Sequence, residues 1–445
     1  MLELGDNRFW NILDRAVGRE NAAMAARAFE EPASVSVRLN PAKVSSDFAK
    51  EHFGKDIAQV PWCQSGYFLE DRPRFTLDPL FHAGCYYVQD SSAMYVGRIF
   101  RNILNKLEGL GRPVRVLDLC AAPGGKTTDL AASLRLKFGD GFMLVANEVM
   151  RGRASILAEN VTLWGDANVV VTSADPKAFA KMEGFFDVIL ADVPCSGEGM
   201  FRKDPKALEG WSEDVVALCA SRQKRILGDA WPALRSGGFL IYSTCTFEAA
   251  ENEENVNWIA AELGAEIMEC EMFRGIFRTS NGGALLVPGF VKGEGQFAAL
   301  LHKTSVASSW NSKGVRPDDS MLWVPESIRK DAGSLAWLRP LRIGIPLGAR
   351  KGNDFVPSAD LALAADESIV QNVHDFNYFR AEVDEGMALQ FLHRDNIFVE
   401  GYPKGYLLIC FQGHPLGFVK NLGNRWNSLL PHGRRIRMDI EKTES

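Results

Sequence analysis

Two cysteines at the ends of apolar runs are the residues in this sequence best placed to do chemistry. Cys195 ends the run FDVILADVPC at 186–195, and Cys245 ends GFLIYSTC at 238–245. A cysteine thiolate beside a bound cofactor is typical of covalent catalysis. The free thiol is only a few per cent ionised near pH 7, so the site must favour the thiolate. We therefore predict a covalent step, and the pattern alone leaves open which cysteine attacks.

A glycine-rich loop supplies the second part of the expected site. The run VLDLCAAPGGKTT at 116–128 leaves an apolar segment and begins a helix. Gly124 and Gly125 let the backbone approach a ligand, and the helix N-terminus offers free N–H groups. A phosphate-binding P-loop is excluded, because it needs glycine at position 120, where the chain has cysteine. The loop also lacks the GxGxxG pattern of NAD and FAD sites, so S-adenosylmethionine, an adenosine without phosphates, is the favoured ligand.

Four acidic residues end successive apolar runs: Asp118, Glu148, Asp175 and Asp192. Ligands of open α/β sheets bind outside the carboxyl ends of the strands, so these acids should lie together. We expect Glu148 to accept hydrogen bonds from ribose hydroxyls and Asp175 to lie near the adenine. A simple helix-capping role is an equally good interpretation of any one acid taken alone. The predicted cofactor-binding residues are Cys120, Ala121, Ala122, Pro123, Gly124, Gly125, Lys126, Glu148, Asp175 and Asp192.

A thiol beside a methyl donor suggests methylation of carbon 5 of cytosine. Thiolate addition to carbon 6 makes carbon 5 nucleophilic; a base then removes the carbon 5 proton and the thiol is eliminated. Lys126 would favour the thiolate, and Asp192 would hydrogen-bond the pyrimidine. Enzymes that methylate exocyclic nitrogens carry an Asn/Asp-Pro-Pro-aromatic loop. Here the loop is Asp192-Val193-Pro194-Cys195, which favours carbon.

The elements that must position these residues follow from the hydrophobic pattern. Apolar runs occur at 114–120, 142–147, 168–172, 186–191, 238–243 and 296–301. Helical stretches such as Met150–Trp164 and Glu213–Leu234 lie between most of them. Such alternation predicts an α/β fold with a Rossmann-like, doubly wound and largely parallel sheet.

The 445-residue chain has room for several domains. Residues 1–85 combine a helical stretch with a strand-like run and predict a small α/β module that binds RNA. Residues 86–303 form the predicted catalytic domain, and the Ser-rich stretch 304–319 is the predicted linker. An intermediate module at 320–385 precedes short, glycine-broken strands at 386–445, which predict a small β-barrel.

The charge distribution points to RNA. The net charge of −6 excludes a uniformly basic nucleic-acid binder, so contact must be local. Gly401–Arg437 has no Asp or Glu, and aromatic residues are interleaved with its basic ones. Its predicted RNA-binding residues are Lys404, Lys420, Arg425, Arg434, Arg435 and Arg437.

The remaining composition favours the cytoplasm. The eight cysteines include no CxxC pair, and the seven histidines are dispersed, so we expect neither a disulfide framework nor a metal. Free thiols are typical of a reducing compartment. The sequence has no apolar run of membrane-spanning length, and MLELGDNRFW does not read as a secretory signal. We expect a cytoplasmic monomer with no membrane contact.

Several motifs resemble the Nop/Sun family of RNA cytosine-5 methyltransferases. They are RLNP at 38–41, GCYYVQDSSAM at 84–94, DLCAAPGGKT at 118–127, ANE at 146–148, AD at 174–175, DVPCSGEG at 192–199, STCT at 243–246 and ENEEN at 251–255. The resemblance implies that Cys245 attacks the base, that Cys195 assists product release, and that S-adenosylmethionine is the cofactor. The tail and the stretch at 342–364 resemble the RsmF-like bacterial subgroup, which modifies small-subunit ribosomal RNA and ends in a PUA-like domain.

The leading hypothesis is therefore an RNA cytosine-5 methyltransferase acting on ribosomal RNA or the small ribosomal subunit. Transfer RNA is the nearest alternative substrate. A non-catalytic RNA-binding assembly factor is an alternative of another class, although both motif cysteines and the glycine loop are present. A small-molecule or protein methyltransferase would leave the basic tail unexplained.

Overall fold

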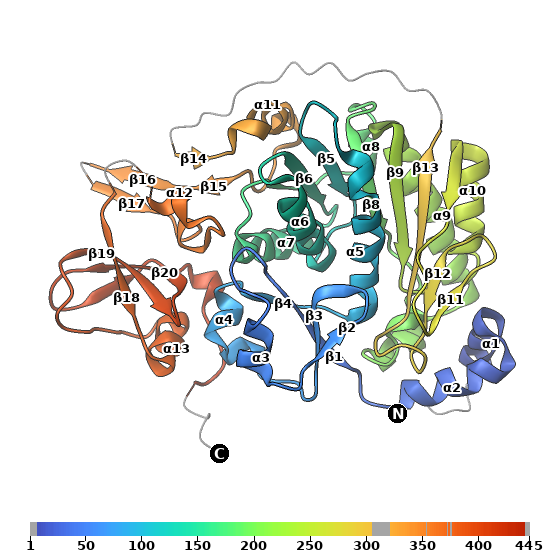
Figure 1. Cartoon of the computed structure of the whole chain (residues 1–445), viewed down its shortest axis with the longest axis horizontal. Coiled ribbons are helices and arrows are strands. Elements are labelled where there is room, and N and C mark those ends of the chain that lie inside the picture. The colour runs from blue at the N-terminus through green and yellow to red at the C-terminus, as the bar shows by residue number, and fades with distance from the viewer. Residues whose placement is uncertain (1–6, 305–320, 353, 372, 374–375, 441–445) are drawn as a thin grey trace.

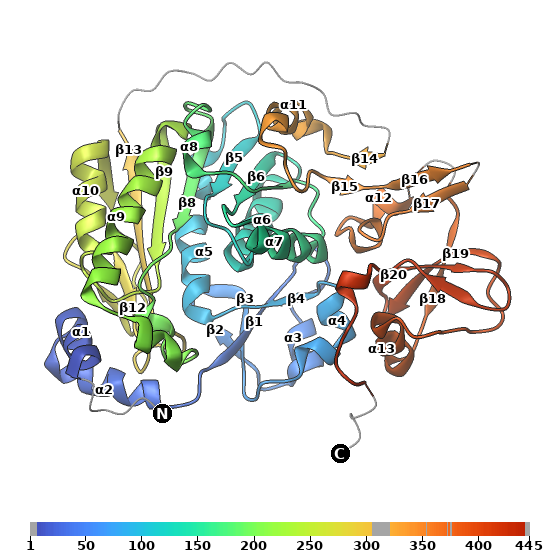
Figure 2. The same cartoon turned by 180° about the vertical axis from the view of Figure 1, so that it is seen from behind.

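A nine-stranded sheet forms the centre of the computed structural model, which describes residues 7–304, 321–352, 354–371, 373 and 376–440 (Figures 1 and 2). The predicted linker 304–319 lies, except for Thr304, outside the described residues. The strands of the sheet are β5 (Val114–Asp118), β6 (Phe142–Asn147), β7 (Val169–Thr172), β8 (Phe186–Asp192), β9 (Leu234–Thr244), β10 (Ala265–Met268), β11 (Ile276–Arg278), β12 (Ala284–Leu286) and β13 (Gln296–Lys303).

The strand order is β11-β12-β13-β9-β8-β5-β6-β7, with β10 paired to the edge of β13. Strands β5 to β9 are mutually parallel, and β13 runs antiparallel to β9. The chain moves outward from β5 through β6 to β7, then returns to β8 on the other side of β5. This reversal between β5 and β8 is the place where doubly wound sheets bind ligands. The Rossmann-like fold predicted from the apolar runs is confirmed.

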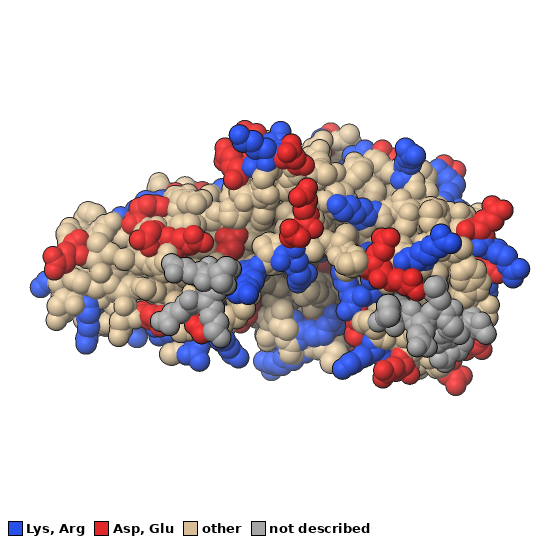
Figure 3. Space-filling view, turned by 90° about the horizontal axis from the view of Figure 1, so that it is seen from below, with Lys and Arg blue, Asp and Glu red and all other residues tan. Residues whose placement is uncertain are grey.

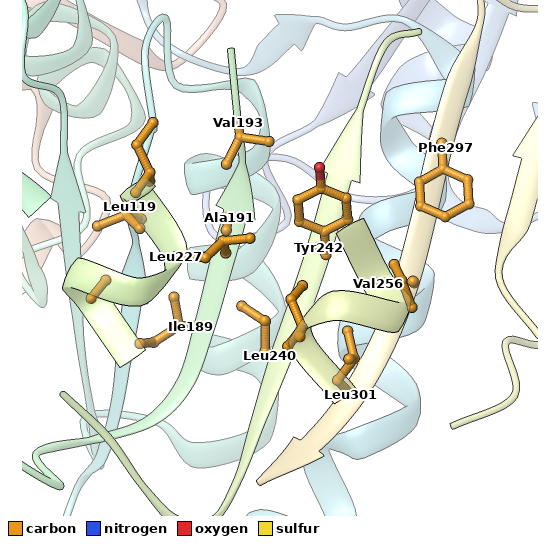
Figure 4. Close-up of a cluster of buried hydrophobic side chains, with 14 of the residues drawn as sticks. Leu119, Ile189, Ala191, Val193, Leu227, Leu240, Tyr242, Val256, Phe297 and Leu301 are labelled. Carbon is orange, nitrogen blue, oxygen red and sulfur yellow. The ribbon is translucent and has the colours of Figure 1, made fainter. Parts of the chain in front are cut away.

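Helices cover both faces of the sheet. They are α5 (Ser91–Ile103), α6 (Gly125–Phe138), α7 (Arg151–Trp164), α8 (Pro176–Phe179), α9 (Glu213–Ala230) and α10 (Glu253–Leu263). Figure 4 shows side chains from alternate positions of β8, β9 and β13, including Ile189, Leu240 and Leu301, facing Leu227 of α9 and Val256 of α10. Alternation along each strand places the other set of side chains in a second core, against α5, α6 and α7.

The N-terminal part divides into two pieces. The helices α1 (Asn7–Val17) and α2 (Arg19–Glu30) pack on the central domain, where Phe9 lies 5.6 Å from Phe201 and Phe29 lies 6.1 Å from Phe247 between ring centroids. The following elements form a separate antiparallel sheet of order β2-β3-β1-β4 with two short helices. They are β1 (Val35–Leu39), α3 (Phe48–Phe53), β2 (Ala58–Val60), β3 (Cys63–Leu69), α4 (Pro79–His82) and β4 (Tyr86–Val88). Because β4 pairs with β1, this sheet extends three residues past the predicted boundary at 85.

The C-terminal part holds a four-stranded sheet of order β18-β19-β20-β21, which the pairings of the described residues leave open. Its elements are β18 (Tyr378–Glu382), α13 (Glu385–His393), β19 (Gly405–Phe411), β20 (His414–Asn421) and β21 (Trp426–Ser428). Strand β18 lies before the predicted boundary at 386, but it belongs to this sheet because it pairs in parallel with β19. Between the nine-stranded sheet and this C-terminal sheet, the chain forms a run of shorter elements. They are β14 (Leu322–Trp323), α11 (Arg329–Ser334), β15 (Ile345–Pro346), β16 (Gly348–Lys351), β17 (Asp354–Pro357) and α12 (Glu367–Gln371).

Candidate active site

The loop between β5 and α6 forms the floor of the candidate site. Gly124 has φ 117°, a left-handed conformation that favours glycine, and α6 begins at the next residue. A side chain at Gly125 would place its Cβ 3.3 Å from the Tyr87 ring, so the N-terminal sheet closely approaches the loop. Buried Arg38 of β1 donates to the Gly125 carbonyl at 3.1 Å and to the Thr128 hydroxyl. The first turn of α6 is therefore held from two sides.

Asp118 lies beneath this loop with one oxygen available. The side chain is fully buried, and its Oδ2 accepts a 2.6 Å hydrogen bond from Thr127. Its Oδ1 is buried without a hydrogen-bond partner among the described residues. Burial raises the pKa of Asp118 to about 7. A cationic or N–H-bearing ligand group would satisfy this oxygen, so the site fits a cofactor with an amino or ammonium group.

The two acids predicted to bind the nucleoside have different surroundings. Glu148 follows β6 and is buried, with one oxygen accepting from the Met150 backbone N–H at 2.9 Å and the other 3.3 Å from Arg153. Asp175 is exposed and caps α8, accepting from the Lys177 backbone N–H at 3.0 Å. Glu148 directly follows β6, whereas Asp175 lies beyond the end of β7 (Val169–Thr172) at the start of α8. Both accept local backbone hydrogen bonds, and their role toward a nucleoside stays a prediction.

Lys126 connects the loop between β5 and α6, the predicted cofactor loop, with the end of the neighbouring strand β8. Its Nζ lies 2.8 Å from Oδ2 of Asp192, the last residue of β8. Burial alone would lower the pKa of Lys126, but the charge of Asp192 and the hydrogen bond between them raise it above its ordinary value. An electrostatic interaction with Cys245 also raises the pKa of Lys126, so Lys126 stays protonated beside Asp192.

The two cysteines of β8 and β9 meet at the same edge. Their sulfur atoms are 3.2 Å apart, and the Cys245 backbone N–H donates to the Cys195 sulfur at 3.3 Å. Both side chains are half-buried. The hydrogen bond with Cys245, followed by burial, raises the pKa of Cys195 well above its ordinary value. Cys195 is therefore held as a thiol. Cys120 on the cofactor loop also stays protonated, because burial raises its pKa.

The structure thus brings together the cofactor loop, Asp118, Lys126, Asp192 and the two cysteines. The predicted RNA-binding residues of the tail lie in the C-terminal unit and fall into two groups. Lys420 lies 3.1 Å from Asp354, and half-buried Arg434 lies 2.6 Å from Asp360, so these two cations are engaged within the protein. The exposed group consists of Lys404, Arg425, Arg435 and Arg437.

Three buried polar residues that support the site were not predicted individually. Arg38 holds the cofactor loop, while Glu251 and Gln223 hold the loop that contains Cys195. Arg38 lies in the RLNP motif and Glu251 in the ENEEN motif, so these motifs could have identified both residues from the sequence. Gln223 lies inside a helix and carries no comparable sequence signal.

Searches for other kinds of site found none in the part of the chain that the structure describes. It contains no group of three or more His, Cys, Asp or Glu side chains able to hold a metal ion. None of its helices combines the length and apolar character of a membrane span.

The fold and this strand-edge site define a Rossmann-like methyltransferase. Comparison with protein families gives three matches along the chain. The 16S rRNA methyltransferase RsmB/F model matches residues 111–302, the N-terminal domain of 16S rRNA methyltransferase RsmF matches 6–91, and the RsmF PUA domain matches 379–436. The PUA-like domain expected at the C-terminus is confirmed.

Full-length relatives identify the family. The chain is 30% identical to the ribosomal RNA small subunit methyltransferase F of Serratia proteamaculans, covering 91% of each protein. It is 32% identical to the protein of the same name from Salmonella heidelberg, again covering 91% of each. The chain belongs to the ribosomal RNA small subunit methyltransferase F family.

Solved structures agree with this fold. A methyltransferase homologue from Pyrococcus horikoshii is 27% identical with a TM-score of 0.55, covering 66% of this chain and 93% of that one. NSun6 from the same organism, solved with SFG, has a TM-score of 0.56 at 20% identity, covering 67% of this chain and 98% of the other.

Proposed function

We propose that this protein transfers a methyl group from S-adenosylmethionine to carbon 5 of a cytosine in small-subunit ribosomal RNA. The observation that carries the proposal is the 3.2 Å contact between the Cys195 and Cys245 sulfurs, at the strand edge that holds the cofactor loop. The family supports ribosomal RNA as the substrate, because its named relatives act on the small-subunit molecule.

The residues around the loop fit the proposed cofactor. The unpartnered Oδ1 of Asp118 and the left-handed Gly124 backbone form a cradle for a nucleoside with a charged amino acid end. Glu148 and Asp175 lie at the next strand ends, where ribose and base contacts are expected. When bound, S-adenosylmethionine supplies an electrophilic methyl group.

Cys245 is the nucleophile in this proposal. Its sulfur forms a bond to carbon 6 of the cytosine, which makes carbon 5 an enamine-type nucleophile. After methylation a base takes the carbon 5 proton, and the electrons of that C–H bond restore the double bond between carbons 5 and 6. The sulfur–carbon 6 bond breaks, and its electron pair leaves on the Cys245 sulfur. The ammonium of Lys126 interacts electrostatically with Cys245 and would stabilise the thiolate that attacks. Asp192 orients that ammonium through its 2.8 Å contact.

Cys195 has the complementary role. Its raised pKa keeps a proton on its sulfur, within reach of the Cys245 sulfur. It can donate that proton to the Cys245 sulfur as the sulfur leaves carbon 6, which assists product release, and it then regains a proton from solvent. The raised pKa of Cys195 supports giving it the proton-donating role in this proposal.

We propose that the protein acts in the cytoplasm. All eight cysteines are free, which supports the proposed cytoplasmic location.

We propose that Lys404, Arg425, Arg435 and Arg437 contribute RNA contacts, because they are exposed in a segment without acidic residues.

The proposal is tested by substituting the two cysteines separately. Cys245→Ala is expected to abolish methyl transfer while cofactor binding persists, because only the nucleophile is lost. Cys195→Ala is expected to accumulate a covalent RNA–protein adduct, visible as a gel shift that survives denaturation. Methyl transfer retained by Cys245→Ala would refute the mechanism, and an adduct trapped by Cys245→Ala would reverse the two roles. Bisulfite sequencing of cellular RNA with and without the protein distinguishes ribosomal from transfer RNA.

A further inference from the structure

A buried acid lies between the two cysteine-containing loops. Glu251 follows β9, just before α10, and has no solvent exposure. Its carboxylate accepts hydrogen bonds from the hydroxyl of Ser196 and from the Ser196 backbone N–H at 3.2 Å. It also accepts a 2.6 Å bond from Nε2 of Gln223 on α9. An acid six residues after Cys245 in sequence therefore holds the residue that follows Cys195.

Gln223 completes the hold on the Cys195 loop. The same Nε2 donates to the carbonyl of Pro194 at 2.9 Å, so the residues on both sides of Cys195 are fixed. Oε1 of Gln223 in turn accepts from the Tyr242 hydroxyl at 3.0 Å and from Asn255 at 2.6 Å. Gln223, Tyr242 and Asn255 are all buried, so this part of the arrangement is fixed by packing as well as by hydrogen bonds.

The neighbouring residue holds the Cys245 loop in the same way. Asn252 accepts from the Thr244 hydroxyl at 2.5 Å and donates to the Thr246 carbonyl at 2.9 Å. The hydroxyls of Ser196 and Thr246 meet at 3.1 Å and join the two loops directly. The dipeptide Glu251–Asn252 thus bonds directly to Ser196, Thr244 and Thr246, and it reaches Pro194 through Gln223.

We propose that Glu251 is a positioning residue that fixes the Cys195 loop against Cys245 and so sets the approach of the two sulfurs. It contacts neither sulfur and acts through Ser196 and Gln223. The inference rests on the proposed function, since it concerns the same pair of thiols.

The ionisation of Glu251 makes its positioning role measurable, because turnover should depend on pH. Burial raises the pKa of Glu251 to about 7, and the charge of Glu198 adds to that rise. The titratable groups that face it are Glu198 of the turn after β8, Cys219 of α9, Tyr242 of β9 and Cys195. Only the ionised carboxylate offers two oxygens that accept from all three donors of Ser196 and Gln223. Protonation below pH 7 should therefore loosen the Cys195 loop and slow turnover.

The test is Glu251→Gln, with Glu254→Gln as the matched control. Glu254 is an exposed acid in the first turn of α10. We expect kcat of Glu251→Gln to fall by about 10- to 100-fold, because small misplacements of reacting groups have effects of this size. We also expect KM for RNA and cofactor to stay within about twofold. The acidic limb of the kcat–pH profile near pH 7 should disappear. Glu254→Gln should match the unsubstituted protein in all three measurements.

A second variant keeps the inference testable if Glu251→Gln folds poorly. Ser196→Ala removes one donor to Glu251 and should lower kcat about tenfold at unchanged KM. Normal kcat in Glu251→Gln, or an unaltered acidic limb, would overturn the inference. If Glu251→Gln does not fold, normal kcat in Ser196→Ala would overturn it. Cys245→Ala separates the two proposals: if it is inactive while Glu251→Gln behaves normally, only the role of Glu251 fails.

Discussion

At the scale of single residues, one buried acid in the proposed cofactor site lacks a full set of hydrogen-bond partners. Asp118 is a fully buried carboxyl whose Oδ1 has no hydrogen-bond partner among the described residues. Keeping such a group ionised is unfavourable, which is why its pKa rises to about 7. Without bound ligand, the folded protein therefore holds a proton that the unfolded chain releases near pH 4.

This linkage predicts how stability changes with pH. The folded-state pKa of Asp118 is raised, so its contribution is complete below about pH 4 and is lost as the pH rises through 7. Between pH 5 and pH 8 the ligand-free protein should lose roughly 3 kcal/mol of unfolding free energy from this group. Asp118→Asn should remove that part of the dependence, measured by urea denaturation at both pH values. The control Asp175→Asn, at an exposed acid, should leave it intact; the same loss in Asp118→Asn as in the unsubstituted chain would contradict the prediction.

At the scale of elements, the turns that follow β8 and β9 are packed backbone to backbone. Gly199 lies in the short turn Glu198–Met200, and its N–H donates to the Cys245 carbonyl at 2.9 Å. The carbonyl of Gly199 in turn accepts from the Gly295 N–H at 3.0 Å. This three-way contact leaves no room for a side chain and helps to hold Cys245 in place.

Gly199→Ala should therefore disturb both stability and activity. Its added Cβ would lie 2.7 Å from the Gly295 backbone and 2.8 Å from the Cys245 carbonyl oxygen, and backbone atoms cannot rotate away. We expect a loss of about 1 to 3 kcal/mol in unfolding free energy, with reduced single-turnover methylation. Gly210→Ala is the control, because a Cβ there meets nothing within 4 Å. Equal stability and equal rates in the two variants would show that the contact is unimportant.

At the scale of the whole molecule, the two ends of the chain pack together. A single apolar cluster contains Leu80 of α4 and Tyr86 of β4 together with Phe391 of α13 and Leu407 of β19. The C-terminal unit is thus fixed beside the N-terminal sheet, which itself holds the cofactor loop through Arg38. Seen from below, Lys and Arg side chains gather around a recess near the middle of the molecule (Figure 3). The carboxyl ends of the parallel strands point toward this side.

This arrangement predicts which basic residues matter for RNA. Replacing Arg435 and Arg437 by Gln should weaken RNA binding, because both are exposed. The slope of log K against log salt should fall by about 1.4 to 1.8, the amount expected for two lost phosphate contacts. Lys420→Gln should change the slope little, since Lys420 is paired with Asp354. Binding titrations over a range of salt concentrations measure both slopes, and an unchanged slope in the double variant would remove these arginines from the RNA site.

The sequence alone was sufficient for the features that depend on local pattern. The apolar runs at 114–120 and 186–191 predicted β5 and β8, because a buried parallel strand needs a nearly continuous hydrophobic segment. The position of Gly124 predicted the turn before α6, whereas ligand binding by that turn stays a prediction. The cysteines at 195 and 245 predicted a shared edge, which their 3.2 Å sulfur contact confirms. The predictions of the strands and of the turn succeeded because strand and turn formation depend on residues that are neighbours in the sequence.

Only the tertiary structure decided which distant groups meet. The partnership of Glu251 with Ser196 spans 55 residues of chain, and Arg434 meets Asp360 across 74. Lys420 and Arg434 looked equivalent to Arg435 and Arg437 in the sequence, yet the first two are engaged within the protein. No local pattern specifies such pairs, because they depend on how separate elements pack once their apolar faces are buried.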